Sequence, residues 1–99
     1  MDNFYDKNKS TVRVVKRNGR AEYFDMEKLE LTIIRASLNS HLSDEEGSRI
    51  AREVVAKITV WMQDKEEVAS EALFHKVWEF LKESHRDVAF MYGTHRDIS

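Results

Sequence analysis

The strongest constraint on the fold is an Asn18-Gly19 pair between two short runs of strand-forming residues. The run before it, Val12-Arg13-Val14-Val15-Lys16, is rich in β-branched residues, and Ala21-Glu22-Tyr23-Phe24 follows it. Asn-Gly is the commonest two-residue hairpin turn, because both residues tolerate a positive φ. The pattern therefore predicts a β-hairpin. Because an isolated hairpin is marginal in water, other parts of the chain must stabilise it.

Two long helices are predicted to follow the hairpin. Asp25 is expected to cap the first, which runs to about Asn39, because its carboxylate can accept backbone N–H groups. Ser43-Asp44-Glu45-Glu46 forms a capping box for the second, which runs to about Gln63. Apolar residues recur at helical spacing along both segments: Leu29, Ile33, Ala36, Ile50, Val54, Ile58 and Trp61.

The remaining chain predicts a short strand and two further helices. Residues 66–69 are too few for a helix and are interpreted as a third strand. Ser70 is expected to cap the third helix, and Ser84 to start the fourth. The order predicts an α+β fold, in which a four-helix bundle is capped by a small three-stranded sheet. We assign residues 1–10 to a flexible N-terminal arm and 11–97 to the domain.

Basic residues are concentrated near the hairpin. Residues 7–20 carry six basic side chains and no acid, whereas the rest of the chain has ten basic and eighteen acidic residues. Lys28 falls in the first turn of the first helix, where its charge opposes the helix dipole. A bound phosphate would reverse that penalty, and a fold that brings Lys16, Arg17 and Lys28 together would attract one. The other interpretation is that these charges only keep an edge strand soluble.

Recognisable enzyme motifs are absent from the sequence. It has no cysteine and only three glycines, and it lacks the P-loop, dinucleotide-binding, nucleophile-elbow and zinc-protease patterns. The four histidines show no metal-ligand spacing, and no two carboxylates are set apart as acid and base. No apolar run resembles a signal peptide or a membrane span. We therefore expect a cytoplasmic binding module that is not an enzyme and has neither a metal site nor a membrane partner.

Residues 14–29 resemble the opening of the ATP-cone domain: a valine-containing strand, Lys-Arg-Asn-Gly, a short strand ending Phe-Asp, and a helix that begins near Glu-Lys-Leu. Later segments match in order. Val68-Ala69-Ser70, followed by Leu73 and Val77, is similar to the family's third strand and helix. Val88-Ala89, Tyr92 and Arg96 are similar to its closing helix, so the resemblance covers about residues 12–96.

This resemblance implies a regulatory nucleotide-binding domain. ATP-cones occur at the N-terminus of many ribonucleotide reductases and after a zinc ribbon in the bacterial repressor of reductase genes. They bind ATP or dATP, with which Mg²⁺ can be associated, and change oligomeric state in response. The absence of cysteine excludes both reductase catalysis and the zinc ribbon. We therefore expect a free-standing module that acts as a homo-oligomer or docks on a larger protein such as a ribonucleotide reductase.

The family's nucleotide-binding positions can be carried over residue by residue. Lys16 and Arg17 match the basic pair that contacts phosphates, and Asn18 lies in the turn beside them. Phe74 stands where the family often has a polar residue, which favours one bound nucleotide over two. The other matched positions, near the base, ribose and phosphates or at the edge of the site, are Val14, Glu22, Asp25, Lys28, Leu29, Ser70 and Arg96.

Two other functions remain open from the sequence. The basic stretch of residues 7–20 could bind nucleic acid, although no aromatic platform is associated with it, so we regard nucleic acid as an unfavoured partner. Alternatively, the chain could be a protein-interaction module that no longer binds nucleotide. The aromatic and apolar residues on or beside the helical stripes that would serve it are Trp61, Met62, Trp78 and Phe80.

Overall fold

A computed structural model describes residues 9–94, and in it the hairpin is present with a different turn. Strands β1 (Lys9–Val15) and β2 (Ala21–Asp25) pair antiparallel, with Val15 opposite Ala21. The turn is a three-residue loop, because Lys16 N donates to Arg20 O at 2.7 Å and Gly19 N to Lys16 O at 2.9 Å. Gly19 has a positive φ of 89°, in the glycine position of a bulged hairpin.

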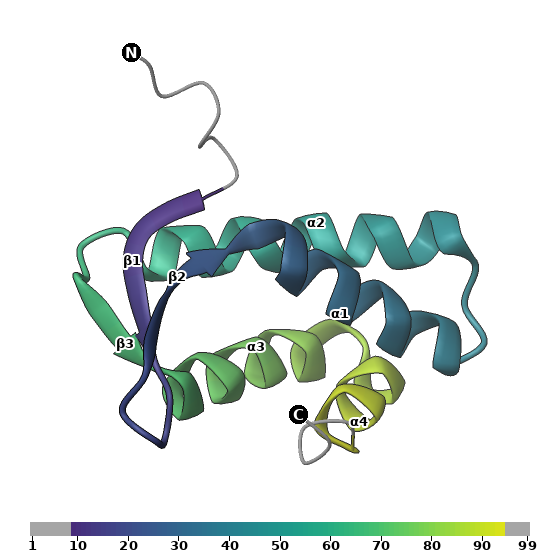
Figure 1. Cartoon of the computed structure of the whole chain (residues 1–99). Helices are drawn as coiled ribbons and strands as arrows, with labels where there is room; N and C mark the ends of the chain where they lie inside the picture. Colours follow the sequence, from purple (N-terminus) through teal and green to yellow (C-terminus); the bar gives the residue numbers. More distant parts are fainter. Residues whose placement is uncertain (1–8, 95–99) are drawn as a thin grey trace.

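The third strand completes a mixed sheet. Strand β3 (Glu67–Ala69) pairs parallel to β1, with Val14 opposite Val68, and the strand order is β2-β1-β3. Figure 1 shows the three strands together at one end of the molecule, with the hairpin tip beside the start of the third helix. Val12, Phe24 and Val68 supply the buried side chains of the sheet. Each strand therefore contributes a buried side chain to the core, and the partly buried Val14 of β1 packs against it as well.

Helices α1 (Met26–Asn39) and α2 (Asp44–Trp61) confirm both predicted N-caps. The Asp25 carboxylate accepts the backbone N–H groups of Glu27 and Lys28, at 3.1 and 3.2 Å. The Ser43 capping box is formed in both directions. The two helices run side by side (Figure 1) and approach closely at Gly47, where an added Cβ would lie only 3.0 Å from the Ser37 Cβ. Helix α2 ends two residues earlier than predicted.

Neither Ser70 nor Ser84 has the position at a helix start that the sequence predicted. Helix α3 (Ser70–Ser84) already includes Ser70, and its N-cap residue is Ala69, which has no side-chain oxygen to make a capping bond. Helix α4 (Arg86–Thr94) starts after His85, whose non-helical backbone (φ −145°, ψ 83°) interrupts the helical path. The carbonyl of His85 then accepts the Ala89 N–H at 3.0 Å and starts α4. Ser84 instead ends α3.

The core is formed by side chains of the four helices together with Val12, Phe24 and Val68 of the strands. The side chains of Ile33, Ile58, Val77 and Leu81 are fully buried in it, and helical spacing predicted the burial of the first two. The four helices and the three-stranded sheet confirm the α+β prediction, while the cap arrangement and the domain limits stay predictions. Residues 1–8 of the predicted arm lie outside the described part, and β1 begins at Lys9. None of the helices within residues 9–94 is long and apolar enough to cross a membrane.

Candidate functional site

A cavity of about 190 Å³ lies where the hairpin meets the starts of α1 and α3 and the end of α4. It brings together seven of the ten predicted site residues: Val14, Lys16, Glu22, Asp25, Lys28, Leu29 and Ser70. Its other lining residues are Tyr23, Phe24, Thr32, Leu73, Phe74 and Tyr92. Segments from both halves of the chain therefore build one site.

The deep side of the cavity is apolar and aromatic. The rings of Phe74 and Tyr92 stack, with centroids 5.0 Å apart and an interplanar angle of 14°. Leu29, which is buried, and Leu73, which is partly buried, line the same cavity. Burial raises the pKa of the Tyr92 hydroxyl, so this group stays a neutral phenol at physiological pH. Flat apolar walls of this kind suit a planar ring, because aromatic rings pack best face to face with an offset or edge to face.

The rim of the cavity is charged. Lys16 Nζ lies 3.0 Å from Glu22 Oε2, and both side chains are about half exposed. The hydrogen bond and charge of Lys16, followed by the charges of Lys28 and Arg20, lower the pKa of Glu22 below its ordinary value of 4.5. Glu22 is therefore surrounded by cations. An anion placed among Lys16 and Lys28 would meet the same positive field.

We predict that replacing Glu22 by glutamine changes how stability depends on pH. Because the folded pKa of Glu22 is lowered, its contribution is fully present above the unfolded pKa and is lost as pH falls through the folded value. The difference in unfolding free energy between the parent chain and Glu22→Gln should stay constant above about pH 5 and shrink in more acidic solution. It should not exceed roughly 1 kcal/mol for so exposed a pair.

Urea unfolding at a series of pH values measures this difference. Lys16→Met supplies the matched background, because it removes the first cause of the lowered pKa. In that background the increment from Glu22→Gln should be smaller. A pH-independent increment of the same size in both backgrounds would contradict the assignment.

Two more of the predicted site residues, Asp25 and Lys28, lie at the start of α1. Asp25 uses its Oδ1 atom to cap the helix, so its first role is structural. Lys28 lies in the first turn, as predicted, and lines the cavity with Leu29 and Thr32. The N-terminal end of α1 and a lysine side chain thus face the same space, an arrangement that favours a bound anion.

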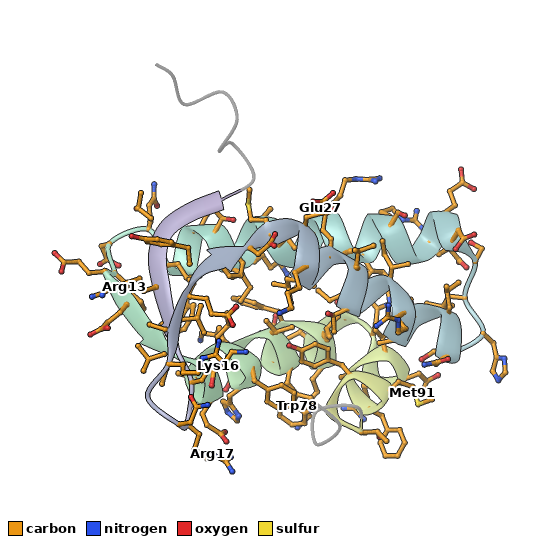
Figure 2. All side chains as sticks on the ribbon, in the orientation of Figure 1. Arg13, Lys16, Arg17, Glu27, Trp78 and Met91 are labelled. Atoms are coloured by element: carbon orange, nitrogen blue, oxygen red, sulfur yellow. The ribbon has the colours of Figure 1, made fainter. Side chains whose placement is uncertain are left out.

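The other predicted residues lie in different places. Arg17 does not line the cavity but pairs with Glu71 at the start of α3. Asn18 also lies outside the lining, and its Oδ1 accepts the Arg20 N–H at 3.0 Å, which stabilises the turn. Figure 2 shows Arg17 at the hairpin tip and Lys16 on the side of the sheet nearer the helices. Arg96 lies outside the described residues.

Sequence reasoning did not select the aromatic wall as part of the site. Helical spacing carried a signal for some of it, because Leu73 and Phe74 lie three and four residues after Ser70 and share its face. Thr32 stands in the same relation to Lys28. For Tyr92 the only signal in the sequence was its similarity to the closing helix of the family. Its stacking on Phe74 could not be predicted, because it depends on how α4 packs against α3.

Metal binding by protein side chains alone finds no support in the described part. Residues 9–94 contain no group of three or more histidine or carboxylate side chains placed to hold an ion. The paired carboxylates near the cavity each have a basic partner, as in Glu22 with Lys16. The cavity lining offers lysine side chains and aromatic rings.

A comparison with known protein families tests the family resemblance seen in the sequence. The family described as the ATP cone domain matches residues 12–98, which is nearly the whole chain. The chain belongs to the ATP-cone family. A search among curated proteins gives no match. ATP-cones are nucleotide-binding regulatory domains that generally bind ATP or dATP, so this ATP-cone is a nucleotide-binding regulatory module.

Proposed function

We propose that this ATP-cone domain binds ATP or dATP in the cavity beneath the hairpin and thereby senses adenine nucleotides. The observation that carries the proposal is the meeting of Lys16 and Lys28 with the stacked Phe74–Tyr92 wall in one cavity. Cations on the rim suit phosphates, and the apolar wall suits a purine base. The two halves of a nucleotide thus find matching chemistry within the lining of one site.

The size of the cavity supports a placement in which the base lies inside it and the phosphates lie outside. Small-molecule pockets commonly measure about 300–1,000 Å³, and this cavity, at about 190 Å³, is smaller. It therefore suits the base, with the phosphates extending to the exposed side chains of the hairpin. Lys16 is about half exposed and Arg17 is largely exposed, so both can meet phosphates from the solvent side.

The proposed roles of the residues follow from this placement and from the family pattern. Lys16, Arg17 and Lys28 would contact the phosphates, together with Arg96 and the turn at Asn18. The apolar side chains of Val14 and Leu29 would pack on the base. Glu22 and Asp25 would accept hydrogen bonds from the ribose or base, and the Ser70 hydroxyl would contribute at the edge. Any Mg²⁺ would be bound mainly through the triphosphate.

Isothermal titration calorimetry tests this function directly. We expect ATP or dATP to bind with a dissociation constant in roughly the micromolar range, which corresponds to about 8 kcal/mol. Three or four charge-assisted contacts of about 1.5–3 kcal/mol each, with burial of the base, can supply that after the costs of association. No heat and no thermal shift with either nucleotide would refute the proposal.

Regulation would follow from a change of assembly. We propose that the nucleotide-bound domain alters its self-association or its docking on a larger protein such as a ribonucleotide reductase. Light scattering of the domain with and without ATP measures the first of these. A mass that does not change with saturating nucleotide would leave docking on a partner as the regulatory output.

Nucleic-acid binding is less favoured by the described contacts. Three basic residues of the 7–20 stretch pair with carboxylates of this chain: Arg13 with Glu67, Lys16 with Glu22, and Arg17 with Glu71. These acids offset the positive charge that would attract a phosphate backbone. Gel-shift assays with random DNA and RNA at low and moderate salt distinguish this function from nucleotide binding.

A further inference from the structure

The basic pair of the hairpin already contacts carboxylates of the same chain. Lys16 pairs with Glu22 at 3.0 Å, and the Arg17 guanidinium donates to Glu71 Oε2. Glu71 lies in the first turn of α3, 54 positions from Arg17 along the chain. The second pair therefore links the hairpin tip to the start of α3, which lie beside each other in Figure 1.

The Arg17–Glu71 pair has the properties of an exchangeable contact. The Arg17 side chain is 83% exposed and that of Glu71 is 51% exposed, so water reaches both groups. Pairs this exposed contribute little to stability. A carboxylate and a phosphate also present the same kind of anionic oxygen acceptor to a guanidinium. Ser70, the residue before Glu71 in α3, lines the cavity, so the pair lies one residue along the chain from the site.

We propose that Glu71 competes with nucleotide phosphates for Arg17, so that the Arg17–Glu71 pair is a latch that the ligand must open. The inference rests on the proposed function, because only a phosphate near the hairpin would compete for the guanidinium. Opening exchanges a carboxylate for a phosphate on Arg17 and releases the hairpin tip from α3. Nucleotide binding is thereby coupled to a contact between two elements of the fold, and the latch lowers the affinity for the nucleotide.

If Glu71 positioned Arg17 instead of competing for it, its removal would change the ATP affinity in the opposite direction. A glutamate that positioned Arg17 for the phosphates would support binding, and its removal would weaken the complex. Glu71→Gln separates the two roles, because glutamine keeps the shape and an oxygen acceptor but removes the charge. If Glu71 competes, ATP should bind about threefold to fivefold more tightly to Glu71→Gln, in keeping with the strength of an exposed ion pair. Adenosine, which has no phosphate, should bind equally to both proteins.

Glu67→Gln is the matched control. Glu67 is also an exposed glutamate, and it pairs with Arg13 at 3.6 Å. Arg13 adjoins the cavity-lining Val14 in β1, so alternation along the strand directs it to the other face of the sheet. Figure 2 shows it on the side away from the helices. The substitution changes the net charge equally but should leave ATP affinity within about twofold of the parent value.

Calorimetry with ATP and adenosine on the parent chain and the two variants completes the test. Tighter ATP binding by Glu71→Gln alone, with adenosine unchanged, supports the latch. Weaker or unchanged ATP binding by Glu71→Gln overturns it, as does an equal gain in Glu67→Gln, which would mean a general charge effect. Failure of the parent chain to bind ATP would overturn the proposed function and the latch with it, so the two failures are distinguishable.

Discussion

Replacing Lys16 and Arg17 together by alanine is expected to abolish ATP binding at accessible concentrations. The two residues are neighbours at the hairpin turn, one lining the cavity and one exposed beside it. Charge-assisted hydrogen bonds contribute about 1.5–3 kcal/mol each, so two of them supply a large part of the roughly 8 kcal/mol of a micromolar complex. Without them the dissociation constant should reach or exceed the millimolar range, as calorimetry would show.

The control for this variant is Arg49→Ala with Arg52→Ala. Both arginines are exposed on α2 and neither lines the cavity, so the pair removes the same charge away from the site. It should bind ATP within a few-fold of the parent affinity, because long-range charge effects are screened by salt. Circular dichroism would verify that both variants are folded. Micromolar binding that persists without Lys16 and Arg17 would exclude the hairpin as the phosphate contact.

Leu81→Ala is expected to cause the largest loss of stability among single substitutions away from the site. Leu81 is fully buried in α3. Truncating such a leucine costs about 2–5 kcal/mol, because the transfer energy of the side chain is lost and a cavity is left. Domains of this size have only about 5–15 kcal/mol of total stability. The midpoint of thermal unfolding should therefore fall by at least about 10 °C.

Leu31→Ala removes the same atoms from the surface of α1. Leu31 is 56% exposed, so its truncation should change the unfolding free energy by no more than about 0.5 kcal/mol. Urea unfolding of both variants, followed by circular dichroism, gives the two free energies on one scale. Equal losses at positions 81 and 31 would contradict the assignment of Leu81 to the core.

The elements that local chemistry specifies were predictable from the sequence. The Asp25 cap and the Ser43 capping box are formed as expected, because each needs only side-chain and backbone groups within three residues. The helical faces of Ile33 and Ile58 followed from their spacing. The hairpin also formed, because Gly19 provides the positive φ that its turn requires.

Sequence patterns gave the wrong turn and the wrong N-cap where neighbouring residues allowed two local structures. Asn18-Gly19 is compatible with a two-residue turn, yet the hydrogen bond from Lys16 N to Arg20 O leaves three residues in the loop. Ser70 has a capping side chain, yet β3 ends at Ala69 and the helix begins immediately after it. In the first case the pairing of β1 with β2 fixes the length of the loop. In the second, the pairing of β1 with β3 extends to Ala69, and β1 lies far from Ser70 in the sequence.

By itself, the sequence determined the elements, the caps of α1 and α2, the basic hairpin and, through its residue pattern, the ATP-cone family. Only the tertiary structure decided that Phe74 stacks on Tyr92 to form an aromatic wall, and that Arg17 turns from the cavity to Glu71. The physical reason is the range of the interactions. Caps and turns depend on groups a few residues apart, whereas these contacts join α3 to α4 and to the hairpin, and no local pattern encodes such distances.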